Sequence, residues 1–247
     1  MNIYKLDAIS STNDYLKELT KQKQLENFTV VSTQFQTNGK GQASNKWISD
    51  KGKNLLFSVL VRCSFLKIEH QAYLNFAISL AIYNVLKRYL ASIYIKWPND
   101  IMADDQKICG ILIENTVKYR QISQSVVGIG LNVNQLNFKN LPNAVSLALL
   151  LKKELNSDLL LEALIFSIKQ QVALLESSSF KNLKVAYEKH LFKKGIYSWF
   201  KTNKGVDVYG KITGVSANGL LQIELDNGVV KKFANKEIYI TNPSNIN

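Results

Sequence analysis

The chain has 247 residues, 46% of them hydrophobic and 20% charged, which is typical of a globular protein of one or two domains and excludes a disordered or fibrous chain. The net charge of +12 suits an anionic ligand, a nucleic acid or an acidic partner, but the lysines are scattered and arginine, which base-reading surfaces favour, occurs only as Arg62, Arg88 and Arg120. No apolar run reaches the roughly 18 residues of a membrane span and the start lacks the layout of a signal peptide, so we expect a cytoplasmic protein without a membrane partner.

The amino-terminal part of the chain predicts a helix, two strands and a long loop. Ser11-Thr12-Asn13-Asp14 is typical of a helix N-cap, and the apolar residues in 15–19 fall at helical spacing. Residues 29–33 and 55–61 form runs typical of strands. The segment 34–53 between them is polar, contains glycine and is longer than an ordinary connection, so we expect it to be functional or disordered.

The middle of the chain predicts the rest of a central sheet and its cover. Apolar residues recur at helical period over residues 68–89, which predicts a long helix packed on the sheet. Three strands follow, the first ending at Lys96 and the others over 108–114 and 125–133. Residues 118–120 are expected in or near the turn that joins the last two strands.

A helical region is predicted over residues 146–191, with breaks near 155–156 and 177–179. Strands and helices alternate unevenly, which favours an α+β fold with a mixed central sheet covered by helices on one face. Both cysteines, Cys63 and Cys109, lie in apolar strand-like runs, which favours reduced core thiols over a disulfide framework.

The pattern of apolar and turn-forming residues changes after Lys193-Lys194-Gly195. Short alternating runs are punctuated by glycine, and Asp226-Asn227-Gly228 predicts a hairpin, since a type I′ turn needs positive φ at both central residues. This pattern indicates a small SH3-like β-barrel. We therefore divide the chain into a catalytic domain over 1–192 and a C-terminal domain over 193–247.

The segment Lys96-Trp97-Pro98-Asn99-Asp100 places a lysine at the end of a strand. Proline biases the residue before it toward extended backbone and cannot donate to a central ladder, so Lys96 is held on a stiff, terminated segment. A lysine fixed in this way suggests a point charge aimed at an anion. The competing interpretation is a solvated lysine at an ordinary strand end.

The centre of the long loop, residues 39–47, combines glycine, lysine and tryptophan. Its glycines let the backbone approach a ligand closely and present amides to an anion, Lys40 and Lys46 add charge, and Trp47 offers a flat apolar face. The spacing matches neither a Walker loop nor a dinucleotide fingerprint. A flexible surface loop is the alternative to a ligand clamp.

Gly128 and Gly130 lie two residues apart on one face of a predicted strand. Glycine weakens a strand unless a bulge or a close neighbour needs the room. The pair therefore indicates either packing against the long helix or a floor that admits a flat ligand.

Five motifs occur in one order and at compatible spacing. They are Ser11-Thr12-Asn13, Gln36 with Gly39-Lys40-Gly41, Lys96-Trp97-Pro98-Asn99-Asp100, Gly110-Ile111-Leu112-Ile113-Glu114 and Gly128-Ile129-Gly130-Leu131-Asn132. Together they resemble the biotin protein ligases over about residues 3–240. The resemblance implies the class II synthetase-like fold of the biotin and lipoate ligases. Because the first motif begins at Ser11, it also implies the form without an N-terminal winged-helix domain, and hence no DNA partner.

The activity that the resemblance implies is a two-step acyl transfer. Biotin and ATP with Mg²⁺ give biotinyl-5′-AMP, which then acylates one lysine of a biotin carboxyl carrier protein, such as that of acetyl-CoA carboxylase. The nucleophile of the second step belongs to the partner, so no catalytic serine, cysteine or histidine is required. No metal ligand is assigned directly, no prosthetic group is expected, and a homodimer is one possible state.

The resemblance also implies the roles of individual residues. Lys96 and Lys40 are the expected catalytic residues. Biotin is expected to contact Ser11, Thr12, Asn13, Gln36, Gly39, Lys40, Gly41, Gln42, Lys96, Gly128 and Gly130. The nucleotide is expected to contact Lys40, Gly41, Gln42, Trp47, Lys96 and Asn132.

The glycine-bearing loop departs from the family pattern, which is often richer in arginine and glycine. Lys40, Gln42 and Ser44 stand at such positions here. Lysine does not reproduce the bidentate grip of arginine, and Gln42 carries no charge. We expect this departure to affect how tightly the adenylate is retained.

Three other functions compete with this interpretation. A lipoate- or octanoate-handling ligase or transferase shares the α+β architecture. A basic nucleic-acid-binding module would account for the charge and the SH3-like tail. A protein that senses biotin or nucleotide without turnover would retain the binding motifs alone.

Overall fold

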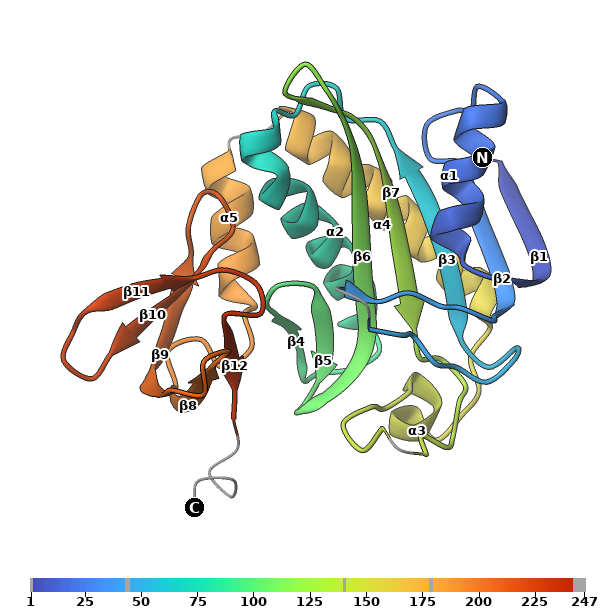
Figure 1. Ribbon diagram of the computed structural model, residues 1–247. Coiled ribbons are helices and arrows are strands. Elements are labelled where there is room, and N and C mark those ends of the chain that lie inside the picture. The colour runs from blue at the N-terminus through green and yellow to red at the C-terminus, as the bar shows by residue number, and fades with distance from the viewer. Residues whose placement is uncertain (1, 43–44, 140, 178–179, 242–247) are drawn as a thin grey trace.

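The computed structural model describes residues 2–42, 45–139, 141–177 and 180–241 (Figure 1). Its main sheet is mixed and has the strand order β1-β2-β3-β7-β6-β5-β4, in which only β1 and β2 pair in parallel. The strands are β1 (Ile3–Ile9), β2 (Val30–Gln36), β3 (Leu55–Val61), β4 (Ile93–Lys96), β5 (Asp100–Ala103), β6 (Gln106–Lys118) and β7 (Gln121–Leu131). The α+β fold with a mixed sheet is thereby confirmed.

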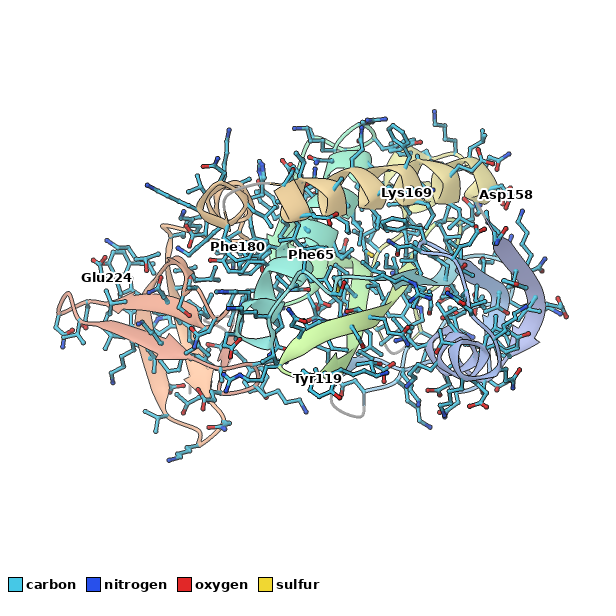
Figure 2. All side chains as sticks on the ribbon, turned by 90° about the horizontal axis from the view of Figure 1, so that it is seen from above. Phe65, Tyr119, Asp158, Lys169, Phe180 and Glu224 are labelled. Atoms are coloured by element: carbon cyan, nitrogen blue, oxygen red, sulfur yellow. The ribbon has the colours of Figure 1, made fainter. Side chains whose placement is uncertain are left out.

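Helices α2 (Gln71–Leu86) and α4 (Ser157–Ser177) cover one face of the main sheet, as expected. Figure 2 shows α4, which carries Lys169, along one side of the sheet. The opposite face is partly covered by α1 (Thr12–Gln22), whose Leu16 packs with Val31 of β2. Because β3 lies between these two layers, all seven of its residues are buried, which its apolar sequence favours.

Several local predictions are confirmed. The Ser11 side chain accepts a hydrogen bond from the backbone nitrogen of Asp14 and so caps α1. The long helix begins at Gln71 after a short 3-10 turn, Ile68–His70. Tyr119 and Arg120 form the turn between β6 and β7, both with positive φ.

The predicted helical region contains α3 (Leu147–Leu151), α4 and α5 (Phe180–Lys189), and the break near residues 155–156 is confirmed. The second predicted break falls on residues 178 and 179, which lie outside the described residues.

Two strands of the main sheet were not predicted. Among the described strands β1 is an edge strand that pairs with β2, and it carries charged residues between its apolar ones. β5 has only four residues and follows the Asn99 turn directly, so its sequence reads as part of the connection between longer strands. A strand of four residues gives too few alternations for a period of two to stand out, and the charged residues of β1 mask its pattern.

The carboxyl-terminal sheet is antiparallel, with the order β11-β10-β9-β8-β12. Its strands are β8 (Tyr197–Thr202), β9 (Asp207–Val215), β10 (Leu221–Leu225), β11 (Val230–Phe233) and β12 (Ile238–Ile240). Within the described residues the edge strands β11 and β12 do not pair, so the sheet is SH3-like but is not a closed barrel.

The hairpin at Asp226-Asn227-Gly228 forms as predicted, between β10 and β11. The type I′ assignment is wrong, because Gly228 has positive φ and Asn227 does not. The connection spans residues 226–229, and a loop of this length is usually built around a type I turn followed by a left-handed glycine.

The two sheets are joined at a few defined contacts, and Figure 1 shows the carboxyl-terminal sheet beside β4, β5 and α5. The indole nitrogen of Trp97 donates to the backbone oxygen of Gly219, at 2.9 Å. On the other side, the backbone nitrogen of Val215 donates to the carboxylate of Glu188 on α5, at 2.8 Å. Among the described helices, none is long and apolar enough to cross a bilayer.

The packing of Gly219 in the carboxyl-terminal domain against α2 can be tested by substitution. Gly219 has φ of +85°, and a Cβ atom there would lie 2.7 Å from the Cβ atom of Ala72 on α2. Gly219→Ala is expected to lower the free energy of unfolding by about 1–2 kcal/mol through backbone strain, and by roughly 1–3 kcal/mol more through the clash. Urea unfolding measures the sum.

The matched control is Gly205→Ala. Gly205 has φ of +80° with no atom within 4 Å of the added Cβ, so this variant carries the backbone strain alone. Equal losses of stability in the two variants would contradict the assigned contact between Gly219 and α2.

Candidate active site

Two neighbouring cavities bring most of the predicted site residues together. The inner cavity lies at the start of α1, above β6 and β7, and is lined by Ser11, Thr12, Asn13, Gln36, Lys40, Gly41, Gln42, Trp47, Asn99, Lys107, Gly110, Ile111, Leu112, Gly128, Ile129 and Gly130. The outer cavity, of about 530 Å³, lies between the glycine-bearing loop, residues 96–100 and the carboxyl-terminal sheet. Both cavities share the lining residues Gly41, Gln42, Trp47, Asn99 and Lys107.

The polar wall of the inner cavity is a hydrogen-bonded network. Thr12 donates to the Gln36 side-chain oxygen from its backbone nitrogen (2.8 Å) and from its hydroxyl (3.1 Å). The hydroxyl of Ser58, which is fully buried, donates to Asn13 Oδ1 at 2.5 Å and lies 2.7 Å from Thr12 Oγ1. Asn13 Nδ2 in turn donates to Glu114 at 2.7 Å. The network holds these side chains in fixed orientations at the wall of the cavity.

Gly128 and Gly130 face α1, on the side of the sheet opposite to α2, so packing against the long helix is not their role. A Cβ atom at Gly128 would collide with the amide of Asn13. A Cβ atom at Gly130 would lie 2.5 Å from the Trp47 indole. The two glycines therefore make room for side chains that line the inner cavity.

The indole of Trp47 lies over a pair of glycines. Gly110 and Gly130 are register partners in β6 and β7, and a Cβ atom at Gly110 would lie 2.9 Å from Trp47 Cζ3. Sequence reasoning quoted Gly110 within a motif but assigned it no role. Its signal was present, since a glycine inside an apolar strand indicates a close neighbour.

The described residues of the loop around Trp47 form a narrow hairpin. Trp47 donates from its backbone nitrogen to Gly39 (2.9 Å), and Gly41 does so to Asn45 (2.7 Å). Gly39 lines neither cavity, but a Cβ atom there would lie 2.6 Å from the Trp47 oxygen, so this hairpin requires glycine at position 39. Ser44, where the family departure was noted, lies outside the described residues.

Lys40 is anchored at the base of this loop. Its ammonium group lies 2.6 Å from the carboxylate of Asp14, which also pairs with Lys17 at 3.1 Å. Partial burial acts to raise the pKa of Asp14, but the hydrogen bonds and charges of Lys40 and Lys17 outweigh it and hold that pKa below its usual value. Lys40 is therefore committed to a protein carboxylate.

Hydrogen bonds with several other parts of the chain hold the turn that follows β4. The Pro98 oxygen accepts from Asn75 Nδ2 (2.5 Å) and from the hydroxyl of the buried Tyr187 (3.4 Å). Trp97 bonds to the carboxyl-terminal sheet, and Asn99 Nδ2 donates to the Ile111 oxygen at 2.6 Å.

Lys96 immediately precedes this turn and lines the outer cavity. Within the part of the chain that the structure describes, it makes no ion pair. Among those residues, no carboxylate neutralises its charge.

Lys107 is a functional candidate that the sequence reasoning missed. It borders both cavities, its ammonium group lies 2.6 Å from Asp100, and it stands 5.6 Å from the centroid of the Trp47 ring. A single lysine at the start of an apolar strand carried no distinct signal. Only the pairing of β6 beside β5 places it next to the Lys96 turn.

The walls of the two cavities are strongly basic. Five lysines line them, namely Lys40, Lys46, Lys96, Lys107 and Lys236, and among the described lining residues Asp100 is the one carboxylate. No group of three potential metal ligands occurs in the described ranges. Mg²⁺ is commonly held by one or two carboxylates together with substrate phosphates, so Asp100 is the residue available to it here.

Asn132 is the one predicted site residue that lies away from both cavities without supporting the loop. It follows β7, is buried, and donates from its side chain to the Val145 oxygen at 3.0 Å. Its predicted contact with a nucleotide stays a prediction.

The position of the Trp47 indole over Gly130 can be tested by substitution. Gly130→Ala is expected to displace the half-buried indole into water, because the added methyl group overlaps the ring, and so to shift the tryptophan emission to the red. The spectrum of Trp47→Phe, subtracted from that of the parent, isolates this residue from Trp97 and Trp199. An unchanged Trp47 emission in Gly130→Ala would show that the indole does not occupy this position.

Comparisons with known proteins find relatives of this chain. A protein from Bacillus spizizenii named bifunctional ligase/repressor BirA is 26% identical over 235 residues, which cover 92% of this chain and 71% of that protein. A biotin--[acetyl-CoA-carboxylase] ligase from Mycobacterium tuberculosis is 30% identical over 122 residues, 48% of this chain and 44% of that one.

Solved structures give the same result for the fold. The biotin protein ligase of Aquifex aeolicus, in complex with biotin and ATP, superposes with a TM-score of 0.81 at 25% identity, covering 97% of this chain and 98% of that one. The Leishmania major biotin protein ligase, with a TM-score of 0.63 at 19% identity over 94% of this chain and 98% of that one, is similar in fold.

A family model described as the biotin/lipoate A/B protein ligase family matches residues 6–132, just over half of the chain. The ligase class that the sequence motifs predict is thereby confirmed at the level of the family. This chain belongs to the biotin/lipoate A/B protein ligase family.

Proposed function

We propose that this chain is an ATP-dependent biotin protein ligase, which forms biotinyl-5′-AMP and transfers biotin to a lysine of a biotin carboxyl carrier protein. The observation that carries the proposal is the pair of adjoining cavities with a basic border. An acid held in the inner cavity and a nucleotide held in the outer one would meet at the residues that the two cavities share. The relatives named as biotin ligases support the same substrates.

The polar wall of the inner cavity favours biotin over lipoate or octanoate. Thr12, Asn13 and Gln36 present hydroxyl and amide groups, which suit the donors and acceptors of a ureido ring. An octanoyl chain offers these groups no partner beyond its carboxylate, so it would add no hydrogen bonds to those that they already make within the protein.

In the first step, a carboxylate oxygen of biotin attacks the α-phosphorus of ATP, the bond from that phosphorus to the bridging oxygen of the β-phosphate breaks, and pyrophosphate leaves. Negative charge accumulates where the two anions meet. Lys96, which makes no ion pair among the described residues, supplies a fixed cation there, and Lys107, which Asp100 holds, adds a second positive charge at the border. The held turn around Pro98 orients Lys96, so little reorganisation is needed during the reaction.

In the second step, the amine of the acceptor lysine attacks the acyl carbon of the mixed anhydride, and AMP leaves. The chain supplies position and charge for this step, whereas the partner supplies the nucleophile. The glycine-bearing loop between the two cavities shields the anhydride from water.

The identity of the acid is tested by exchange of pyrophosphate into ATP, with biotin, lipoate and octanoate supplied separately to the purified protein. Exchange with biotin alone is expected. Exchange with lipoate or octanoate instead would assign the chain to that branch of the family, and none with any acid would leave a non-catalytic binding protein. Addition of a biotin carboxyl carrier domain then tests transfer, which appears as a stable biotin amide on the acceptor.

Lys96→Ala is expected to reduce biotin-dependent pyrophosphate exchange on the order of 10²-fold or more, because one fixed cation is lost from the charged transition state. Lys51→Ala is the matched control, since Lys51 pairs with Asp7 on the surface and lines neither cavity. Near-normal exchange by the Lys96 variant would remove this residue from its assigned role.

A further inference from the structure

The glycine-bearing loop is bonded to the carboxyl-terminal sheet across the mouth of the outer cavity. The side-chain oxygen of Gln42 accepts a hydrogen bond from Asn235 Nδ2 at 2.6 Å, between residues 193 positions apart in the chain. Gln42 lines both cavities, and Asn235 lines the outer one. The bond therefore connects two walls of the cavity assigned to the nucleotide.

Asn235 is presented by a firmly bonded turn between β11 and β12. The backbone nitrogen of Ala234 donates to the Glu237 carboxylate at 2.7 Å, and that of Glu237 donates back to the Ala234 oxygen at 3.1 Å. The backbone nitrogen of Asn203 donates to the Glu237 oxygen at 2.9 Å, which ties the turn to the β8–β9 connection. The donor to Gln42 thus sits on a fixed support.

The loop itself is anchored at its base. Lys40 pairs with Asp14, and Gly41 donates from its backbone nitrogen to Asn45. In the described residues of the loop, the Gln42 side chain is the one that hydrogen-bonds to the carboxyl-terminal sheet. The Gln42–Asn235 pair therefore ties the loop to the carboxyl-terminal sheet, and salt screens such a neutral amide pair far less than an ion pair.

We propose that Asn235 is a positioning residue, which acts through Gln42 to hold the glycine-bearing loop closed over the nucleotide and the acyl-adenylate. The proposal rests on the proposed function above and extends it to the carboxyl-terminal sheet. Loss of the bond is expected to let water hydrolyse the acyl-adenylate, which we call leakage. Water then reaches the anhydride and adds to the acyl carbon, the bond from that carbon to the phosphate oxygen breaks, and biotin and AMP leave with release of a proton.

Two single variants and their combination test the pair. Asn235→Ala and Gln42→Ala are each expected to raise the acceptor-free release of AMP from ATP and biotin by about 2- to 10-fold, the range for one hydrogen bond. The KM for ATP should rise by a similar factor in both single variants. The double variant should release AMP no faster than either single variant, because both substitutions remove the same bond.

The matched control is Asn203→Ala, an exposed asparagine on the same sheet that lines neither cavity. The exchange of lengths in Gln42→Asn with Asn235→Gln keeps an amide pair of the same total reach and should restore the low rate of AMP release. A residue that only stabilised the sheet would lower the thermal midpoint without raising leakage.

Tryptic cleavage of the ligand-free protein at Lys40 and Lys46 reports on the same bond without any chemistry. Faster cleavage in Asn235→Ala and Gln42→Ala than in Asn203→Ala is expected, and the length-exchanged pair should return to the parental rate. Cleavage and leakage of Asn235→Ala equal to those of the Asn203 control, or additive effects in the double variant, would overturn the proposal. Absence of pyrophosphate exchange in the parent would instead contradict the proposed function, and the cleavage rates would still decide the role of Asn235.

Discussion

The hydrogen bonds to the Pro98 carbonyl oxygen are the contacts on which the rest of the site depends. Asn75 of α2 and Tyr187 of α5 both donate to this oxygen, so two helices hold the turn that follows β4. Lys96 precedes that turn and Asp100, the partner of Lys107, follows it. The positions of Lys96 and Lys107 are therefore set by the packing of helices rather than by the loop that covers them.

The paired glycines of β6 and β7 solve a second problem, which is how a flexible loop reaches a defined position. Gly110 and Gly130 face each other in register and leave a flat patch of backbone for the indole of Trp47. Side chains at either position would lift the ring and open the hairpin that ends at Gly39. The sheet thus shapes the loop from below, while Asn235 bonds to it from the other side.

The sequence predicted the elements that local physics determines, such as the Ser11 cap, the periodic helix α2 and the turn at Tyr119. It also predicted most residues of the inner cavity, because their motifs recur together in a known family. Three features depended on pairing that no local pattern carries. These were the short strand β5, the role of Lys107, and the side chains for which Gly128 and Gly130 make room.

The bond from Trp97 to Gly219 has a thermodynamic consequence. It joins the residue after Lys96 to the carboxyl-terminal sheet, so that sheet cannot separate from the main one without disturbing the turn that carries the lysine. A nucleotide that binds between the sheets raises the stability of their association by mass action. Ligand occupancy and the cooperativity of unfolding are therefore linked, and the two sheets behave as one thermodynamic unit most strongly when the enzyme is saturated.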